Sequence, residues 1–350
     1  MNPGTTPENN KQRAMPLVSV IVPCYNVERW AERCIRSLLS QTHPSLEVVA
    51  VNDCSTDGTG ALLDRMAATD ERLRPVHMAK NVGLHAARRA GLKEAKGEFI
   101  GFVDGDDHVA ADMYGTLAGA LLHSNADIAL GGYRTMKWDG TVSRTFSYPK
   151  VQLLEEGLLV RFARGDFGSG VIWSKLYQRS IIEPGLELQL DRRLDSGADY
   201  IVGVGCFASA RQVVTVPGTP YRYDLRPESM SMAKQGAAAF VFQLECYMTC
   251  LDVYADRNEQ VQQAIDDLYV RQLCFDCYRV ERPEDLSPFQ ERLSAILQAL
   301  ARLRPQALYA LVHAFDKAHE PAPPMPPRFH LGQVRISLVK AIKAFIKGRA

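Results

Sequence analysis

The sequence has no uninterrupted apolar run of about 18 residues, the length that a membrane-spanning helix requires. Its most apolar window, residues 237–251, is interrupted by Gln243 and Glu245, so we expect no membrane span. An excess of one charge is also missing, because 41 Lys and Arg residues oppose 40 Asp and Glu residues, for a formal net charge of +1. Such a balance excludes a strongly basic nucleic-acid-binding protein at the level of the whole chain, and we expect no nucleic-acid partner.

A secretion signal is absent as well. Residues 1–15 are polar, contain Asn, Thr and Pro, and lack an apolar core, which predicts a disordered leader. The eight cysteines are unevenly spaced, so without a signal peptide we expect free thiols in a reducing cytoplasm. A hydrophobic content of 46% and a charged content of 23% are typical of a globular protein, and 350 residues suit either one large domain or a domain plus an appendage.

From residue 16 to residue 133 the sequence alternates between strand and helix patterns. Apolar runs of strand length occupy residues 17–22, 46–51, 73–77, 99–103 and 127–133, whereas apolar residues at helical spacing occupy residues 29–40, 59–68, 81–97 and 113–123. This βαβ pattern predicts an α/β fold with a mostly parallel, Rossmann-like central sheet flanked by helices. The polar loops that follow three of these strands would then lie at one edge of the sheet, where open α/β sheets bind ligands.

Three carboxylates in four residues, Asp104, Asp106 and Asp107, follow the strand pattern of residues 99–103. A protein core cannot hold that many unpaired charges, so the cluster must face water or a cation. Mn²⁺ or Mg²⁺ would suit it, because hard divalent cations prefer oxygen ligands and often share them with substrate phosphates. The tetrapeptide alone fits equally well an acidic surface turn in which Gly105 adopts a special backbone conformation.

Four motifs make the interpretation more specific. The segments VSVIVPCYN (residues 18–26), VNDCSTDGT (51–59), NVGLHAAR (81–88) and GEFIGFVDGDD (97–107) occur in this order. Together they resemble the family 2 glycosyltransferases, which are inverting enzymes of the GT-A fold. The close resemblance covers residues 17 to about 133, and a looser one extends to residue 231. It implies a glycosyltransferase domain at residues 16–232, with a nucleotide-binding half at 16–133 and an acceptor half at 134–232.

The resemblance assigns the donor site to residues that follow the strands. Asp53 corresponds to the aspartate whose carboxylate accepts the uracil N3–H, which would select a UDP-sugar. Arg88 corresponds to the arginine that pairs with the diphosphate. Asp106 would bind the Mn²⁺ or Mg²⁺ ion directly, and Asp104 would contact the ribose or the ion. The base and the ribose would be flanked by Pro23, Tyr25 and Asn26.

In the acceptor half the resemblance implies a general base. The family usually has Gly-Glu-Asp where this chain has Gly197, Ala198 and Asp199, so the expected base is Asp199, with Asp195 as the alternative. One carboxylate is sufficient, because the inverting transfer needs a base only for the proton of the acceptor hydroxyl. The missing Glu leaves this base with one fewer neighbour to orient it.

Three further side chains are candidates for contact with the acceptor or the phosphates. Trp173 lies in a Trp-x-Lys-Leu-Tyr segment and suits either stacking on a sugar ring or packing in the core. Arg222 and Arg226 lie in a segment, residues 221–231, that resembles a loop able to fold over the donor, although a solvated basic turn fits them as well.

Residues 233–320 lie outside the motifs and show amphipathic helical patterns. Cys246, Cys250, Cys274 and Cys277 fall at helical spacing, but buried free thiols fit these apolar stretches better than a zinc site does. A Pro-rich linker follows at residues 321–328. Residues 329–350 form a basic amphipathic helical pattern without an acidic residue, which suits an anionic membrane surface or docking on the protein itself or on a partner.

These features predict an inverting, metal-dependent glycosyltransferase that moves a hexosyl or N-acetylhexosaminyl group from a UDP-sugar to a glycan or lipid-linked glycan. We expect it in the cytoplasm, with the terminal helix allowing peripheral attachment to the inner face of the cell membrane. The replacement at Ala198 leaves open a second class, a nucleotide-sugar-binding protein without catalytic activity. A nucleotidyltransferase is disfavoured, because residues 23–26 form no Gly-rich basic loop.

Overall fold

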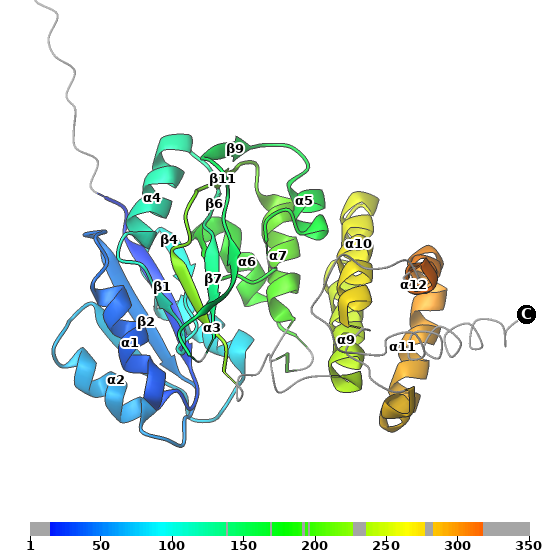
Figure 1. The fold of residues 1–350 in the computed structure, drawn as a ribbon, viewed down its shortest axis with the longest axis horizontal. Coiled ribbons are helices and arrows are strands. Elements are labelled where there is room, and N and C mark those ends of the chain that lie inside the picture. The colour runs from blue at the N-terminus through cyan, green and yellow to red at the C-terminus, as the bar shows by residue number, and fades with distance from the viewer. Residues whose placement is uncertain are drawn as a thin grey trace, which may run out of the picture.

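The computed structural model describes residues 15–137, 139–168, 170–190, 193–194, 197–226, 236–276 and 283–317. An α/β body surrounds a central sheet, and a group of helices formed by residues 237–317 stands beside this body (Figure 1). The leader up to residue 14, the Pro-rich linker and the terminal amphipathic helix that the sequence predicts lie outside the described residues.

The central sheet contains eight strands: β1 (Val18–Cys24), β2 (Leu46–Asn52), β3 (Leu73–His77), β4 (Phe99–Phe102), β6 (Ile128–Leu130), β9 (Gln152–Leu154), β10 (Lys175–Gln178) and β11 (Val213–Thr215). Their order is β3-β2-β1-β4-β10-β6-β11-β9. Strands β1 to β4 pair in parallel, so their carboxyl ends meet at one edge of the sheet. Only β9 and β10 run antiparallel to their neighbours, which confirms the predicted α/β class with a mostly parallel sheet.

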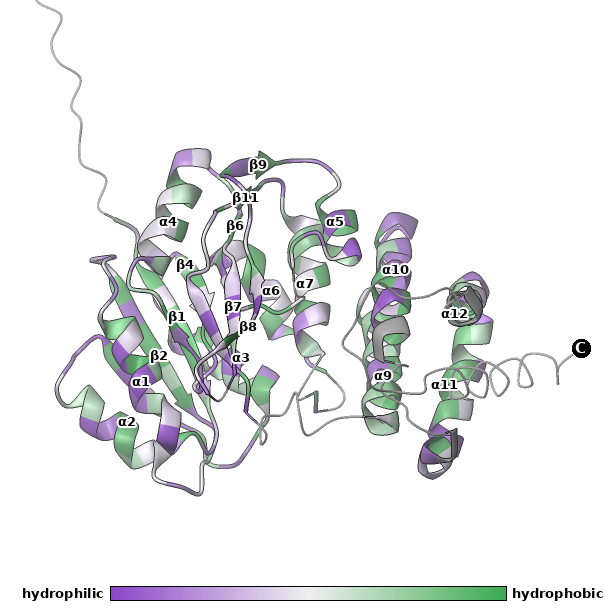
Figure 2. Ribbon diagram, in the orientation of Figure 1, coloured by the Kyte–Doolittle hydropathy of each residue, from purple (hydrophilic) through white to green (hydrophobic). Residues whose placement is uncertain are grey.

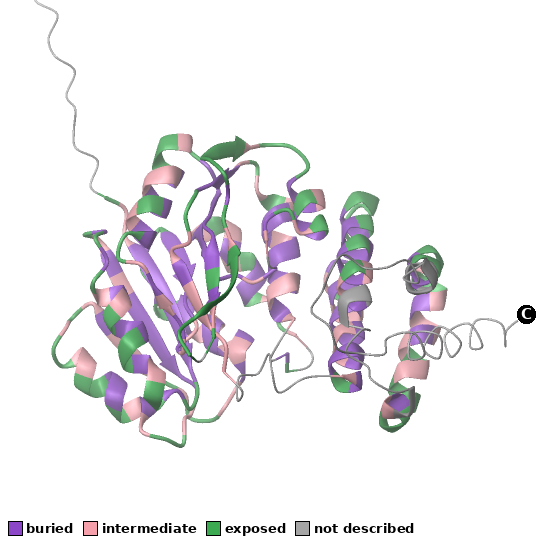
Figure 3. Ribbon diagram, viewed as in Figure 1, coloured by how far each residue is buried: buried purple, intermediate pink, exposed green. Residues whose placement is uncertain are grey.

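Helices cover both faces of this sheet: α1 (Glu28–Leu39), α2 (Thr59–Ala67), α3 (Leu84–Glu94), α4 (Met113–Ser124), α5 (Leu158–Arg164), α6 (Arg179–Glu187) and α7 (Ala198–Ser209). Every residue of β1 is buried, and its side chains alternate between two cores. Val20 and Val22 pack in the core that includes α1, α2 and α4, whereas Ile21 packs with α3, α6 and α7. The hydrophobic strands of Figure 2 are the buried strands of Figure 3, as a sheet covered on both faces requires.

A second, four-stranded sheet consists of β5 (His108–Val109), β7 (Tyr133–Met136), β8 (Val142–Phe146) and β12 (Tyr221–Asp224), in the order β5-β12-β7-β8. The single strand expected at residues 127–133 is therefore wrong in its extent, because β6 and β7 belong to different sheets. Gly132 lies at this break, where an added Cβ would come within 2.3 Å of the carbonyl oxygen of Gly218. The pairing of β12 with β5 brings the chain after residue 221 next to the carboxylate loop at 104–107.

The C-terminal part is helical, as expected: α9 (Ala237–Val253), α10 (Glu259–Asp276), the 3₁₀ helix η2 (Pro283–Phe289), α11 (Gln290–Leu303) and α12 (Pro305–Lys317). Leu244 of α9 and Leu268 of α10 are buried in the same core as Ile201 of α7. None of the described helices combines the length and the low polarity needed to cross a bilayer. Cys246 and Cys250 are buried free thiols, and the side chains of the other two cysteines of the zinc alternative lie outside the description.

Candidate active site

The carboxyl edge of the parallel strands gathers the residues that the sequence predicts for the donor site. The chain leaves β1 through Tyr25 and Asn26, leaves β2 through Asp53, and leaves β4 through the carboxylate loop, residues 104–107. Arg88 projects toward this edge from α3. The contacts among these side chains determine what chemistry the edge can perform.

Arg88 connects the carboxylate loop to the acceptor half of the protein. Its side chain is only 2% exposed, and a buried guanidinium is stable only when it is paired. Nη2 of Arg88 donates to Oδ1 of Asp104 at 2.9 Å, and Nη1 donates to Oδ1 of Asp199 at 2.5 Å. Burial alone would lower the pKa of Arg88, but the charges of Asp199 and Asp104 raise it above its usual value. The buried cation thus joins the predicted donor side to the predicted base.

Asp199 lies in the first turn of α7, where the positive end of the helix dipole favours a carboxylate. Its Oδ2 atom accepts a hydrogen bond from the backbone N–H of Ile172 at 3.3 Å, while Arg88 holds Oδ1. The two contacts orient the carboxylate without the Glu that the family usually has at position 198, where Ala198 is buried. The alternative base, Asp195, lies outside the described residues.

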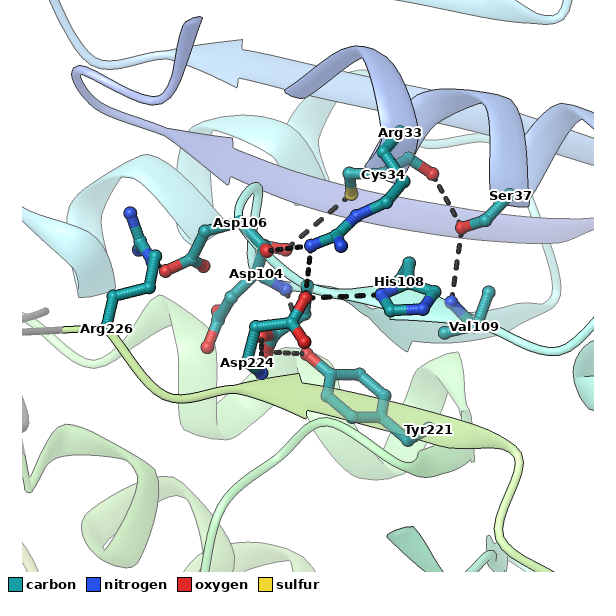
Figure 4. A network of polar contacts seen from close by, with 11 residues as sticks. Arg33, Cys34, Ser37, Asp104, Asp106, His108, Val109, Tyr221, Asp224 and Arg226 are labelled. Carbon is teal, nitrogen blue, oxygen red and sulfur yellow. Dashed lines mark hydrogen bonds and ion pairs between the residues drawn. The ribbon is translucent and has the colours of Figure 1, made fainter. Parts of the chain in front are cut away.

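Tyr221 ties the carboxylate loop to β12 (Figure 4). Its hydroxyl donates to Oδ2 of Asp107 at 2.6 Å and accepts the backbone N–H of Asp104 at 3.2 Å. The backbone N–H of Asp224 donates to the other oxygen of Asp107 at 2.9 Å. Burial, followed by the charge of Asp104, raises the pKa of Asp107 well above its ordinary value. Asp107 therefore supports the loop from inside the protein rather than facing a ligand.

Asp106, the expected metal ligand, is partly exposed and ion-paired with Arg226, which follows the end of β12. The guanidinium of Arg226 also lies over the ring of Trp30, with Cζ 4.0 Å from the ring centroid. Arg33, on the same helix as Trp30, forms an ion pair with Asp224 and donates to the backbone oxygen of Asp106 at 3.4 Å. Helix α1 and the end of β12 thus hold the loop between them (Figure 4).

Asp53 is buried, and its carboxylate binds the backbone that leads into α3. Its two oxygens accept the N–H groups of Val82 at 2.7 Å and Gly83 at 2.9 Å. This contact fixes the start of the helix that carries Arg88, a structural role in addition to the predicted contact with uracil. Each carboxylate oxygen has a second lone pair with which to accept a ligand N–H.

The side chains expected to flank the nucleotide differ in exposure. Pro23 is buried within β1, where it pairs with Val51 of β2. Asn26 has a positive φ of 52°, and its side-chain oxygen accepts the backbone N–H of Thr56 at 2.8 Å. Tyr25 is 48% exposed, which leaves its ring available for contact with a base.

Two predicted contact residues do not join this cluster. Trp173 is 5% exposed and stacks on Tyr221 with 4.3 Å between the ring centroids. This favours packing in the core over stacking on a sugar. Arg222 follows Tyr221 in β12 and therefore points to the opposite face of the second sheet. There it lines a separate cavity of about 200 Å³ with the first turns of α4, including Met113 and Thr116.

Sequence reasoning missed several supporting residues, namely Trp30, Arg33, Lys175, Tyr221 and Asp224. Lys175 is buried behind the site, and desolvation lowers its pKa to about 8. Its ammonium donates to the backbone oxygen of Val171 at 2.6 Å. Lys175 and Tyr221 belong to segments that resemble the family, but the partners of Tyr221, Asp104 and Asp107, are more than 100 residues away in the sequence.

Comparisons with known proteins show what the chain is similar to. The model of glycosyl transferase family 2 matches residues 19–183. The uncharacterized glycosyltransferase EpsJ of Bacillus subtilis is 34% identical over 226 residues, which are 62% of this chain and 63% of that protein. The succinoglycan biosynthesis protein ExoO of Rhizobium meliloti is 30% identical over 223 residues, with 62% of this chain and 63% of that protein covered. The chain thus spans less than two thirds of the length of these relatives.

Solved structures share the fold at low sequence identity. Residues 1–349 of S. aureus TarS, solved in complex with UDP-GlcNAc, match with a TM-score of 0.66 at 20% identity, covering 95% of this chain and 92% of that one. The mannosyltransferase PcManGT of Pyrobaculum calidifontis, in complex with GDP-Man and Mn²⁺, matches with a TM-score of 0.50 at 18% identity, covering 95% and 86%. The sheet order and the site at its carboxyl edge define the GT-A class of α/β proteins. Within that class, residues 19–183 are similar to glycosyl transferase family 2, as are the relatives named above.

Proposed function

We propose that this protein is an inverting, metal-dependent glycosyltransferase that moves a sugar from a UDP-sugar to a glycan or lipid-linked glycan. The observation that carries the proposal is the buried bridge from Asp104 through Arg88 to Asp199. It fixes a carboxylate of the donor side and a carboxylate of the acceptor side at one guanidinium, as a transfer between two bound substrates requires.

In this mechanism Asp199 takes the proton of the acceptor hydroxyl. The acceptor oxygen forms a bond to the anomeric carbon on the face opposite the departing diphosphate, so the configuration inverts. Arg88 and the N–H of Ile172 hold the carboxylate of Asp199 in place during this step. The sugar leaves the diphosphate with the electron pair on the phosphate oxygen, so no protein acid is needed there.

The residues present fit a divalent cation that is shared with the substrate. Among the described residues, no group of three or more His, Cys, Asp or Glu side chains forms a metal site of its own. Mg²⁺ and Mn²⁺ commonly use one or two carboxylates and complete their coordination with water and substrate phosphates. Asp106, partly exposed at the loop, is the candidate protein ligand, with Asp104 beside it. A bound Mn²⁺ or Mg²⁺ would offset the charge that develops on the departing diphosphate.

The donor and acceptor classes rest on the residues and on the relatives together. Asp53 and Tyr25 provide an acceptor for the uracil N3–H and an exposed ring at the sheet edge. UDP-GlcNAc is bound by TarS, and the names of the relatives include a teichuronic acid biosynthesis glycosyltransferase and a succinoglycan biosynthesis protein. We place the reaction on the cytoplasmic side of the membrane, with residues 329–350 as the candidate contact with anionic lipid.

A panel of UDP-sugars with Mn²⁺, assayed for release of UDP, tests this proposal. We expect one donor to be turned over, and Asp199→Asn to lower kcat by about 1,000-fold, within the range of general-base catalysis. Asp106→Asn should abolish Mn²⁺-dependent release of UDP. Asp252→Asn, an exposed aspartate on α9, is the matched control and should leave turnover unchanged. Mn²⁺-dependent binding of UDP without turnover of any donor would support the catalytically silent alternative instead.

A further inference from the structure

The two carboxylates at the ends of the Asp-x-Asp motif have different counter-ions. Asp104 is paired with Arg88, which comes from the interior, is 2% exposed and is also held by Asp199. Asp106 is paired with Arg226, which follows the last residue of β12 and has a side chain that is 14% exposed. A cation arriving from solvent can displace Arg226 from Asp106 at a much lower free-energy cost than it can displace Arg88 from Asp104. The reason is that Arg88 is buried and has no aqueous environment to enter.

The position of the Arg226 side chain is fixed by contacts with helix α1. Its guanidinium lies over the ring of Trp30 with Cζ 4.0 Å from the ring centroid, a separation typical of a cation–π contact. Arg33, one turn further along α1, forms an ion pair with Asp224, two residues before Arg226. Both contacts hold the end of β12 against α1, and Figure 4 shows the contact of Arg33 with Asp224 and the guanidinium of Arg226 next to Asp106.

This arrangement conflicts with cation binding at the same carboxylate. An ion of charge +2 at Asp106 would lie beside the guanidinium at a distance where like charges repel strongly in a partly buried site. The carboxylate that Arg226 contacts is also the group that would supply an oxygen ligand to the ion. Arg226 and a divalent cation therefore exclude each other at Asp106.

We propose that Arg226 is the resident counter-ion of Asp106 in the donor-free enzyme and that it competes with the divalent cation for this carboxylate. The inference rests on the proposed function, because it assumes that the cation binds at Asp106. A cation alone must displace Arg226 without compensation, so it binds weakly. A cation that arrives with a diphosphate brings negative charge that offsets the loss of the ion pair. The competition thus makes cation binding depend on the donor and prevents the site from filling with metal alone.

Mn²⁺ binding to the full-length chain, measured from the electron paramagnetic resonance of free Mn²⁺ with and without UDP, tests the competition. We expect Arg226→Gln to tighten Mn²⁺ binding in the absence of UDP by about tenfold, equivalent to about 1.4 kcal/mol. The enhancement of Mn²⁺ affinity by UDP should shrink in this variant, because the two effects are thermodynamically linked. Arg226→Lys keeps a cation near Asp106 and should retain the weak binding of the natural chain. Arg134→Gln, an exposed arginine on the neighbouring strand β7, should change neither affinity.

A second measurement reports on the contact between Arg226 and Trp30. Addition of Mn²⁺ and UDP should change the tryptophan fluorescence of the natural chain as Arg226 leaves the ring, and Trp30→Phe should abolish that change. Unchanged or weaker Mn²⁺ binding by a folded Arg226→Gln variant would overturn the competition. If Asp106→Asn binds Mn²⁺ as the natural chain does, the cation is not at Asp106 and the competition is refuted. The release of UDP from UDP-sugars tests the proposed function separately from this outcome.

Discussion

At the scale of the residue, Arg88 carries two contacts that no other cation can reproduce. Its planar guanidinium donates to Asp104 and Asp199 in different directions, whereas the ammonium of Lys is a compact charge on a shorter reach. We expect Arg88→Lys to lower kcat for UDP-sugar turnover by about 100-fold, because displacement of the base by about 1 Å has an effect of this size. Steady-state assays on a folded Arg88→Lys variant measure this decrease in kcat.

A variant that removes the charge of Arg88 should lower the stability of the fold. Arg88→Met leaves the two carboxylates without their buried cation and should lower the free energy of unfolding by about 3 kcal/mol, measured by urea denaturation. Arg89→Lys, at the next position of α3, is the control for both measurements and should change neither. A fully active Arg88→Lys enzyme would show that the bridge does not position Asp199.

Asp107 makes the stability of the protein depend on pH in a direction opposite to that of most carboxylates. Burial raises its pKa above the value of about 3.9 in the unfolded chain. The folded chain therefore holds the proton more tightly, so the stabilising contribution is complete below pH 3.9 and is lost as the pH rises through the folded pKa. Asn resembles the protonated form, so Asp107→Asn should gain stability relative to the natural chain as the pH rises from about 4.5 to 7.5.

Differential scanning calorimetry across that pH range measures the difference in Tm between the two proteins. The oxygen of Asn can still accept the hydroxyl of Tyr221, so the variant should remain folded. A difference in Tm that is constant with pH would show that Asp107 does not titrate differently in the folded and unfolded states.

At the scale of the element, β12 positions the carboxylate loop through Tyr221. Tyr221→Phe keeps the stacking on Trp173 but removes the hydroxyl that contacts Asp104 and Asp107. We expect Mn²⁺ affinity in the presence of UDP to fall by about 10-fold to 100-fold, the usual effect of losing a group that orients a metal ligand. Tyr223→Phe, which also stacks on Trp173 from β12, should retain the affinity and serves as the control. Equal affinities in the two variants would contradict the assigned role.

Elements with a clear apolar run or helical spacing could be predicted from the sequence, and elements without one could not. Strands β1 to β4 and helices α1 to α4 follow from apolar runs and helical spacing, and the four motifs place Asp53, Arg88 and Asp106 near one sheet edge. The second sheet escaped prediction because strands such as β7 and β12 contain no continuous apolar run and pair across long sequence separations. For the same reason, the contact of Arg88 with Asp199 had no sequence pattern to indicate it, since a tertiary contact between two charges leaves no periodicity.

At the scale of the whole molecule, one core extends from the sheet into the C-terminal helices. Phe162 of α5, Ile201 of α7, Leu244 of α9 and Leu268 of α10 belong to a single buried cluster. The hydroxyl of Tyr254, which follows α9, donates to the backbone oxygen of Ile201 at 2.7 Å, so the helices also satisfy a polar group of the α/β body. The boundary near residue 232 stays a prediction from the motifs, and the packing is continuous across it.

This continuity predicts how truncated chains behave. A chain that ends at residue 235 would expose the faces of α5 and α7 that α9 and α10 now cover, and each fully buried Leu, Ile or Phe side chain contributes about 1.5–3 kcal/mol. We expect such a chain to lose its cooperative thermal transition and to aggregate. A chain that ends at residue 317 retains this core and should unfold cooperatively and bind UDP with Mn²⁺ as the full-length protein does. Calorimetry and UDP binding on the two truncated proteins distinguish these outcomes; a shorter chain that unfolds cooperatively and binds UDP would establish residues 16–232 as an independent domain, with the helices as an appendage to it.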